Sequence, residues 1–250
     1  MKKYRADELI VSRGYACDTH EAAALIMADK VRADQDSSTI INKPGMLLAE
    51  DIFLSVKKPK QYVSRGGYKL AGALDDFDLD VTELRCVDLG ASTGGFTDCL
   101  LQRGAQSVCA IDVGYGQLAH TLQVDPRVTV FDRTNVRTAD PASIGAPFDV
   151  VVADLSFIGL SQVAHDIARL VSVEGFCVLL IKPQFEARKD EVGEGGIVTD
   201  PDVLQQVLSD TIASLEKAGL QTIGLTSSSI KGAAGNTEYL VYCRKTDEAK

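Results

Sequence analysis

Two residues of this 250-residue sequence stand where a side chain could move a proton. Asp154 follows the apolar run VVVA, and Lys182 follows the apolar run VLLI, so each is placed where a buried strand would end. Burial disfavours the charged form of a lysine, which is what a general base requires. A lysine that reaches back to the surface from a strand end is the common alternative. We therefore treat Lys182 as a candidate base, with Asp154 as a neighbouring proton-handling group.

The segment VDLGASTGGFTD, residues 87–98, has the composition of a ligand-binding turn. An apolar run ends in an acid, a glycine-rich loop follows, and a helical pattern begins. Glycine has no Cβ, so a ligand can approach the backbone closely at such a loop. No lysine follows the glycines, as a phosphate loop would require, and the glycine spacing differs from that of a dinucleotide fingerprint. Asp88 and Asp98 would also oppose a pyrophosphate.

S-adenosylmethionine fits this loop better, because it carries a sulfonium and an ammonium and has no phosphate. Asp112 ends the next apolar run, about twenty residues on, where a carboxylate can bind both ribose hydroxyls. Asp132 ends the following run, at a place suited to the adenine. Any one of these acids could simply begin a turn, but three at successive strand ends favour a cofactor site. The expected site consists of Asp88, Gly90, Ala91, Ser92, Gly94, Gly95, Phe96, Asp112, Asp132 and Asp154.

Two absent motifs narrow the kinds of atom that could accept the methyl group of S-adenosylmethionine. Enzymes that methylate exocyclic amines usually carry a proline pair after the fourth strand, whereas this sequence reads ADLSF there. None of the six cysteines follows a proline, which excludes the usual nucleophile for pyrimidine C5. An oxygen acceptor remains, and its proton must leave near the transition state.

The rhythm of the chain indicates the elements that would position these residues. From residue 84 onward, runs of consecutive apolar residues alternate with helical patterns, as in a parallel sheet covered by helices on both faces. The last two strand-like runs, in 220–230 and 237–245, have no helix between them and should pair antiparallel. The fold class is therefore α/β: a class I (Rossmann-like) methyltransferase sheet with an antiparallel C-terminal hairpin. A small α+β domain precedes it. We place the domains at 1–59 and 65–250, with a linker at 60–64.

Several motifs carry a family resemblance over nearly the whole chain. They include YVSRGGYKLAGAL, DLGASTGGFTD, IDVGYGQLA, ADLSFI, KPQFE, GGIVTDP and SIKGAAGNTEYL. The chain resembles the TlyA or hemolysin A family. Members of this family are ribosomal RNA 2′-O-methyltransferases with an S4 domain and an FtsJ-like catalytic domain. The resemblance implies a cytidine ribose as acceptor and ribosomal RNA or ribosomal subunits as partners. It also implies a catalytic tetrad of Lys69, Asp154, Lys182 and Glu238.

Charge is distributed unevenly along the chain. Residues 1–69 hold 12 Lys and Arg against 9 Asp and Glu, whereas residues 70–250 hold 14 against 26. A basic N-terminal part on an acidic protein is either a solvated linker or a local phosphate-binding patch. With the S4-like resemblance of residues 1–59, we expect RNA contacts from Arg5, Arg13, Lys57, Lys58, Lys60 and Arg65.

Other functions receive less support from the sequence. The six cysteines are scattered and the three histidines are not clustered, so we expect neither a metal site nor a disulfide framework. Without disulfides, we expect a cytoplasmic location. No apolar run reaches the ~20 residues of a membrane span. A membrane-active hemolysin is therefore the weakest alternative. A non-catalytic RNA-binding or ribosome-assembly factor is the other one, and the intact tetrad argues against it.

Overall fold

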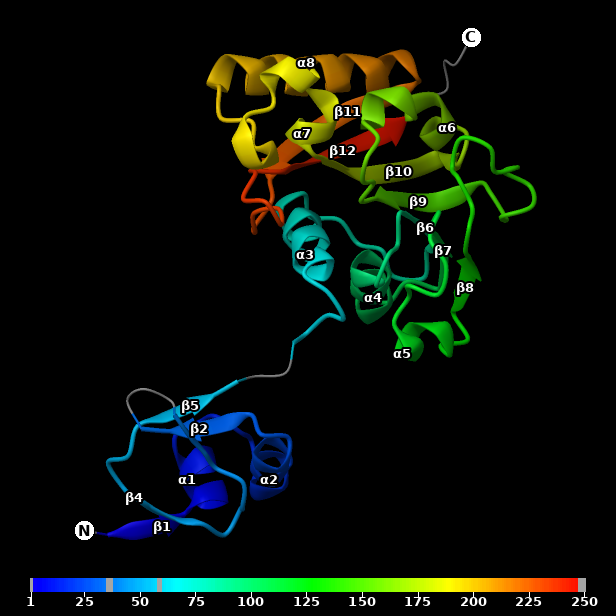
Figure 1. The fold of residues 1–250 in the computed structure, drawn as a ribbon. Helices are drawn as coiled ribbons and strands as arrows, with labels where there is room; N and C mark the ends of the chain where they lie inside the picture. The colour runs from blue at the N-terminus through cyan, green and yellow to red at the C-terminus, as the bar shows by residue number, and fades with distance from the viewer. Residues whose placement is uncertain (1, 35–37, 58–59, 247–250) are drawn as a thin grey trace. The chain divides into compact units, whose positions relative to one another are not determined.

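The computed structural model describes residues 2–34, 38–57 and 60–246. The chain forms two compact units, Met1–Gln61 and Tyr62–Lys250 (Figure 1). The boundary lies inside the expected linker 60–64. Tyr62, in the middle of that linker, is buried in the core of the second unit.

The first unit is a small α+β module. Its helices are α1 (Ala6–Ser12) and α2 (Thr19–Met27), and its strands are β1 (Lys3–Arg5), β2 (Val31–Ala33), β3 (Thr39–Ile40), β4 (Leu47–Ala49) and β5 (Leu54–Val56). Asp18 caps α2 by accepting a hydrogen bond from Glu21 N. Strands β3, β2 and β5 form an antiparallel sheet, and β1 pairs with β4. The pair β1–β4 was not predicted from the sequence, because strands of three residues show no alternation.

The second unit is built on a seven-stranded sheet in the order β11-β12-β10-β9-β6-β7-β8. The strands are β6 (Arg85–Leu89), β7 (Ser107–Ile111), β8 (Val128–Phe131), β9 (Phe148–Ala153), β10 (Val171–Ile181), β11 (Leu220–Ser227) and β12 (Tyr239–Lys245). Strands β6 to β10 are parallel, whereas β12 runs antiparallel to both β10 and β11. The expected antiparallel hairpin is confirmed, and its second strand is inserted next to β10.

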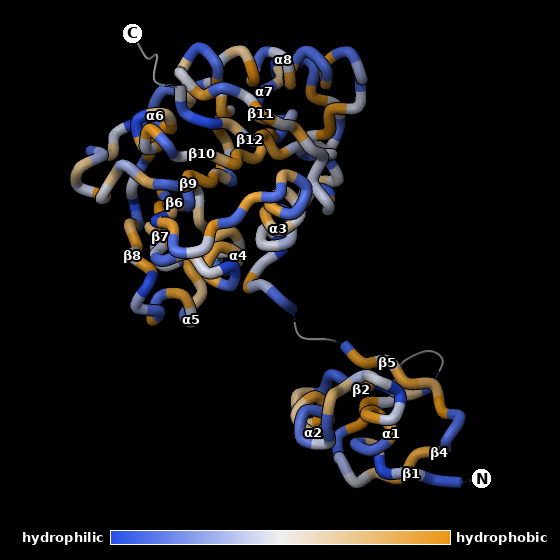
Figure 2. The backbone as a smooth tube through the Cα atoms, turned by 180° about the vertical axis from the view of Figure 1, so that it is seen from behind, coloured by the Kyte–Doolittle hydropathy of each residue, from blue (hydrophilic) through white to orange (hydrophobic). Residues whose placement is uncertain are grey.

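Helices cover both faces of this sheet (Figure 1). They are α3 (Gly66–Asp76), α4 (Gly95–Gln102), α5 (His120–Gln123), α6 (Ala164–Ala168), α7 (Pro183–Glu186) and α8 (Pro201–Lys217), with short 3-10 turns η1 (Leu160–Gln162), η2 (Lys189–Glu191) and η3 (Glu194–Gly196). Within β9, Val150 and Val152 pack on the side of α3 and α4, whereas Val151 and Ala153 pack on the side of α6 and α8. The central strands are thus buried on both faces, as their continuous apolar runs predict, and they form the hydrophobic band of Figure 2.

Parallel strands bring their carboxyl ends to one edge of the sheet, and the candidate residues lie there. The ends of β6, β7, β8, β9 and β10 lead into the loops that hold the glycine segment, Asp112, Asp132, Asp154 and Lys182. Within the described part of the chain, no helix combines the length and apolar character needed to cross a membrane.

Candidate active site

The glycine loop joins β6 to α4 and crosses the end of β9 at close range. Gly90 has φ +80°, and a Cβ added there would lie 2.8 Å from the carbonyl oxygen of Asp154. Both the backbone conformation and the space therefore require glycine. Asp154 N donates in turn to Leu89 O, so the ends of β6 and β9 are locked together.

Asp112 links the loops after β6 and β7. Its carboxylate accepts hydrogen bonds from Ser92 N at 2.8 Å and from Gly114 N at 2.6 Å. Each carboxylate oxygen has a second lone pair, so Asp112 can still accept from ligand hydroxyls. Asp132 makes a similar bond with Gly116 N at 3.0 Å. The acids at the strand ends thus order the loops in addition to any role toward a ligand.

A cavity of about 400 Å³ opens between these loops. Four of the ten expected cofactor residues line it: Gly90, Ser92, Asp112 and Asp154. The other six lie outside its lining, namely Asp88, Ala91, Gly94, Gly95, Phe96 and Asp132. The remaining polar and apolar wall was not predicted from the sequence; it consists of Leu89, Ile111, Val113, Gln117, Thr134, Asn135, Val136, Leu155, Ser156, Phe157 and Ile158. The segment 134–136 follows β8, so the strand-end rule could have identified it.

Asp88 lies beneath the glycine loop and is completely buried. Its Oδ2 accepts hydrogen bonds from Thr97 N and Thr97 Oγ1, which fixes the start of α4, while its Oδ1 has no hydrogen-bond partner among the described residues. Burial raises the pKa of this carboxyl to about 7, and the charges of Asp154 and Asp112 act in the same direction, although the Thr97 bonds oppose them. Asp88 therefore supports the loop from below.

Lys182 is held by the loop that follows β9. Its Nζ lies 2.5 Å from Asp154 Oδ1 and donates a hydrogen bond of 3.0 Å to Ser156 Oγ. The same nitrogen lies 5.7 Å from the centroid of the Phe185 ring. Only 9% of the lysine is exposed, so it does not reach back into solvent. The apolar run before it thus indicated its burial correctly.

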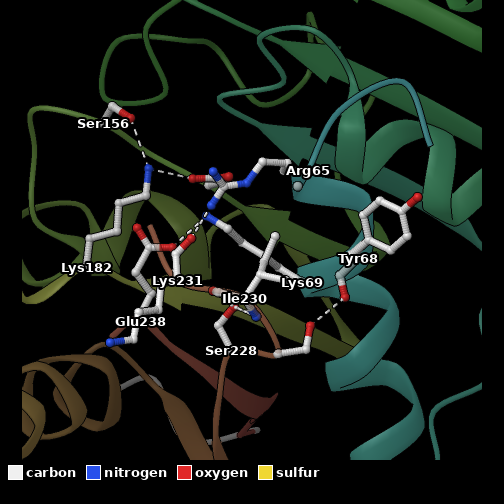
Figure 3. Close-up of polar contacts among 12 residues, drawn as sticks. Arg65, Tyr68, Lys69, Ser156, Lys182, Ser228, Ile230, Lys231 and Glu238 are labelled. Atoms are coloured by element: carbon white, nitrogen blue, oxygen red, sulfur yellow. Dashed lines mark hydrogen bonds and ion pairs between the residues drawn. The ribbon is translucent and has the colours of Figure 1, made fainter. Parts of the chain in front are cut away.

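Lys69 and Glu238 form a second, more deeply buried pair. Lys69 is the fourth residue of α3, and its Nζ lies 2.5 Å from Glu238 Oε2. Glu238 is 3% exposed and directly precedes β12. The loop before it is fixed by Asn236, which accepts from Val198 N and donates to Gly196 O. The side chains of Lys69, Lys182 and Glu238 converge on one region, with Ser156 at its rim (Figure 3).

This arrangement suits proton handling next to a small-ligand cavity. An unpaired buried charge is strongly unfavourable, so each lysine is buried together with a carboxylate. Asp154 belongs both to the cavity lining and to the Lys182 pair. A reacting atom beside Asp154 would therefore lie next to a buried lysine nitrogen.

The expected RNA-binding residues differ in their exposure and in the groups that they bind. Lys57 and Lys60 are exposed, and Lys58 lies outside the described residues. Arg5 is exposed but paired with Asp7 at 2.6 Å. Two further arginines bind backbone carbonyls: Arg13 donates to Glu50 O and Ile52 O, and Arg65 donates to Lys231 O. These arginines therefore also hold loops in place.

The sequence matches a model of the FtsJ-like methyltransferase family over residues 62–245. It is also 43% identical to the Mycobacterium tuberculosis 16S/23S rRNA (cytidine-2′-O)-methyltransferase TlyA, over 99% of this chain and 92% of the relative. The chain belongs to the TlyA family of FtsJ-like methyltransferases. The matched region contains the cavity and all four tetrad positions, so the catalytic unit of this TlyA-family protein is the second unit.

Two other relatives agree with this assignment. Hemolysin A of Brachyspira hyodysenteriae is 37% identical over 95% of this chain and 98% of its own length. The solved structure of a candidate hemolysin from Streptococcus thermophilus has a TM-score of 0.74 and 37% identity, and covers 99% of this chain and 90% of its own. The TlyA family thus includes proteins with two kinds of name, methyltransferase and hemolysin.

Proposed function

We propose that this TlyA-family enzyme transfers the methyl group of S-adenosylmethionine to a ribose 2′-hydroxyl, of a cytidine, in ribosomal RNA. The observation that carries the proposal is the meeting of two buried lysine–carboxylate pairs beside an acid-lined cavity. The M. tuberculosis relative is named for this reaction. The loop from Asp154 to Phe157 contains no proline pair that would hold an amine, which agrees with an oxygen acceptor.

The cavity fits S-adenosylmethionine in size and chemistry. Its about 400 Å³ falls within the range of small-ligand pockets. Asp112 would accept from the ribose hydroxyls, while Asn135 and the apolar side chains of Val136 and Ile158 would surround the adenine. Asp154 supplies negative charge near the sulfonium end. When bound, the cofactor supplies the electrophilic methyl group.

Lys182 and Asp154 take the proton of the attacking hydroxyl. A ribose hydroxyl is a weak acid, so its oxygen must lose the proton near the transition state. In the proposed arrangement, Lys182 Nζ passes a proton to Asp154 Oδ1, 2.5 Å away, and the resulting neutral amine accepts the proton of the hydroxyl, while Ser156 keeps the nitrogen directed toward the acceptor. Lys69, paired with Glu238, places a second cationic group beside the reacting oxygen. Precise alignment of hydroxyl and methyl group provides much of the acceleration.

The first unit and the linker would bind the RNA. The basic residues of the first unit and of the linker are candidates for phosphate contacts, which position a substrate without reading its bases. The S4-like character of residues 1–59 is part of this proposal. So is a cytoplasmic location, where ribosomal RNA is found.

The proposal is tested by cofactor binding and methyl transfer in parallel. Calorimetry should detect S-adenosylmethionine binding to the wild type and at least tenfold weaker binding to Asp112→Ala, since the ribose hydroxyls lose their acceptor. Transfer of labelled methyl groups to unmodified ribosomal subunits should require the same cavity. Equal binding by the two proteins would contradict the cofactor site, whereas binding without transfer to any RNA would contradict the substrate.

A further inference from the structure

The loop after β9 is anchored at both of its ends by one short segment, residues 182–186. At the first end, Lys182 binds Asp154 and Ser156. At the other end, Glu186 accepts hydrogen bonds from Leu160 N and, at 2.8 Å, from Ser161 Oγ. The KPQFE motif thus contains two anchors, of which only Lys182 has a part in the proposed reaction.

Glu186 lies very close to the backbone of this loop at Gly159. A Cβ at Gly159 would lie 2.5 Å from Glu186 Oε2 and 3.0 Å from Phe185 O, so only glycine leaves room for the carboxylate. Leu160 is the first residue of η1, so its backbone N–H has no acceptor within the turn, and Glu186 accepts from it. The position and the hydrogen-bonding capacity of Glu186 therefore both match the end of the loop.

The stretch between the two anchors is a wall of the cavity. Residues 155–158 all line it. Phe157, in the middle of this stretch, has φ +69°, a left-handed conformation that is rare for an aromatic residue, and its side chain is 92% exposed. Its ring lies 5.7 Å from that of Phe185. A strained backbone of this kind persists only where the surrounding contacts determine it.

We propose that Glu186 is a positioning residue for the methyl transfer. It fixes the far end of loop 155–161, and thereby holds the cavity wall in shape and keeps Ser156 within reach of Lys182. Glu186 does not itself line the cavity. Its effect on turnover rests on the proposed function, whereas its effect on cofactor binding depends only on the cavity.

The experiment compares Glu186→Ala, Glu186→Gln and Ser161→Ala with the wild type. The glutamine oxygen can accept from Leu160 N while its amide donates to Ser161 Oγ, so this variant retains both bonds. S-adenosylmethionine affinity, by calorimetry, and kcat on ribosomal subunits should each fall about tenfold in Glu186→Ala. Glu186→Gln should stay within about threefold of the wild type, and Ser161→Ala should fall between them. Asp210→Ala is the matched control, because Asp210 lines the same surface groove as Glu186 but bonds to Gln206 on its own helix.

The outcomes separate this inference from the proposed function. Wild-type affinity and kcat in Glu186→Ala would overturn the positioning role, as would equal losses in Glu186→Ala and Glu186→Gln. If thermal unfolding shows that Glu186→Ala is not folded, the losses of affinity and kcat in Glu186→Gln and Ser161→Ala decide the question. A wild type that binds S-adenosylmethionine but methylates no ribosomal RNA would refute the proposed substrate, and the binding measurements would still test Glu186.

Discussion

At the scale of single residues, the site depends on charges that are buried in pairs and on one buried acid without a counter-ion. Lys69 with Glu238 and Lys182 with Asp154 neutralise each other at 2.5 Å. Within the part of the chain that the structure describes, Asp88 instead has only neutral partners, Thr97 N and Thr97 Oγ1. Burying its ionised form is therefore unfavourable, and this has a consequence for stability.

Asp88 should make the stability of the fold depend on pH. Its folded-state pKa of about 7 lies above the ordinary value of 3.8, so the folded state holds a proton that the unfolded state has released. Stability should therefore fall as pH rises from about 4 to about 7, by up to about 4 kcal/mol. Asp88→Asn mimics the protonated acid and should remove this component. Urea unfolding at several pH values checks it, and parallel profiles for the two proteins would contradict the assignment.

At the scale of elements, the strand ends explain why the site forms where it does. The sequence predicted the glycine loop, Asp112, Asp154 and the burial of Lys182 because continuous apolar runs mark buried strands, and the next residue is then at the sheet edge. Periodicity could not predict that Asp88 is fully buried and does not line the cavity. It also could not find the Glu186 anchor, which depends on a tertiary contact between two loops.

Gly90→Ala tests the close crossing of the glycine loop over β9. Alanine at φ +80° is strained, and its Cβ would meet Asp154 O at 2.8 Å. We expect a loss of about 1–3 kcal/mol of stability or more, together with weaker S-adenosylmethionine binding. Gly116→Ala is the control, because Gly116 has φ +64° and no atom of the described residues lies within 4 Å of the added Cβ. If both substitutions had the same effect on melting and cofactor affinity, backbone strain alone would account for the loop.

At the scale of the whole molecule, the proposed function divides the task between the two units. The second unit contains the cavity and both ion pairs, and it carries the excess of acidic residues. A polyanionic substrate would be repelled by that unit unless basic residues elsewhere offset the repulsion. In the proposed function, the basic N-terminal part of the chain meets this requirement.

Reversing the charge of Lys57 and Lys60 tests this division. Both are exposed, and the double change to Glu should weaken RNA binding at low salt and reduce its salt dependence by roughly one unit of slope per lost phosphate contact. Cofactor affinity should not change. Lys217→Glu, an exposed lysine at the end of α8, is the comparison for a general charge effect. An equal loss of RNA affinity in Lys217→Glu would mean that net charge, and not the location of the lysines, determines RNA binding.

The most direct test of the account is to identify the methylated nucleoside. Unmodified ribosomal subunits would be incubated with the protein and labelled S-adenosylmethionine, and the RNA digested and analysed by mass spectrometry. We predict 2′-O-methylcytidine, and a loss of at least about 10² in its rate of formation with Lys182→Ala, while that variant still binds the cofactor. A methylated base in the digest, or full activity of Lys182→Ala, would contradict the account.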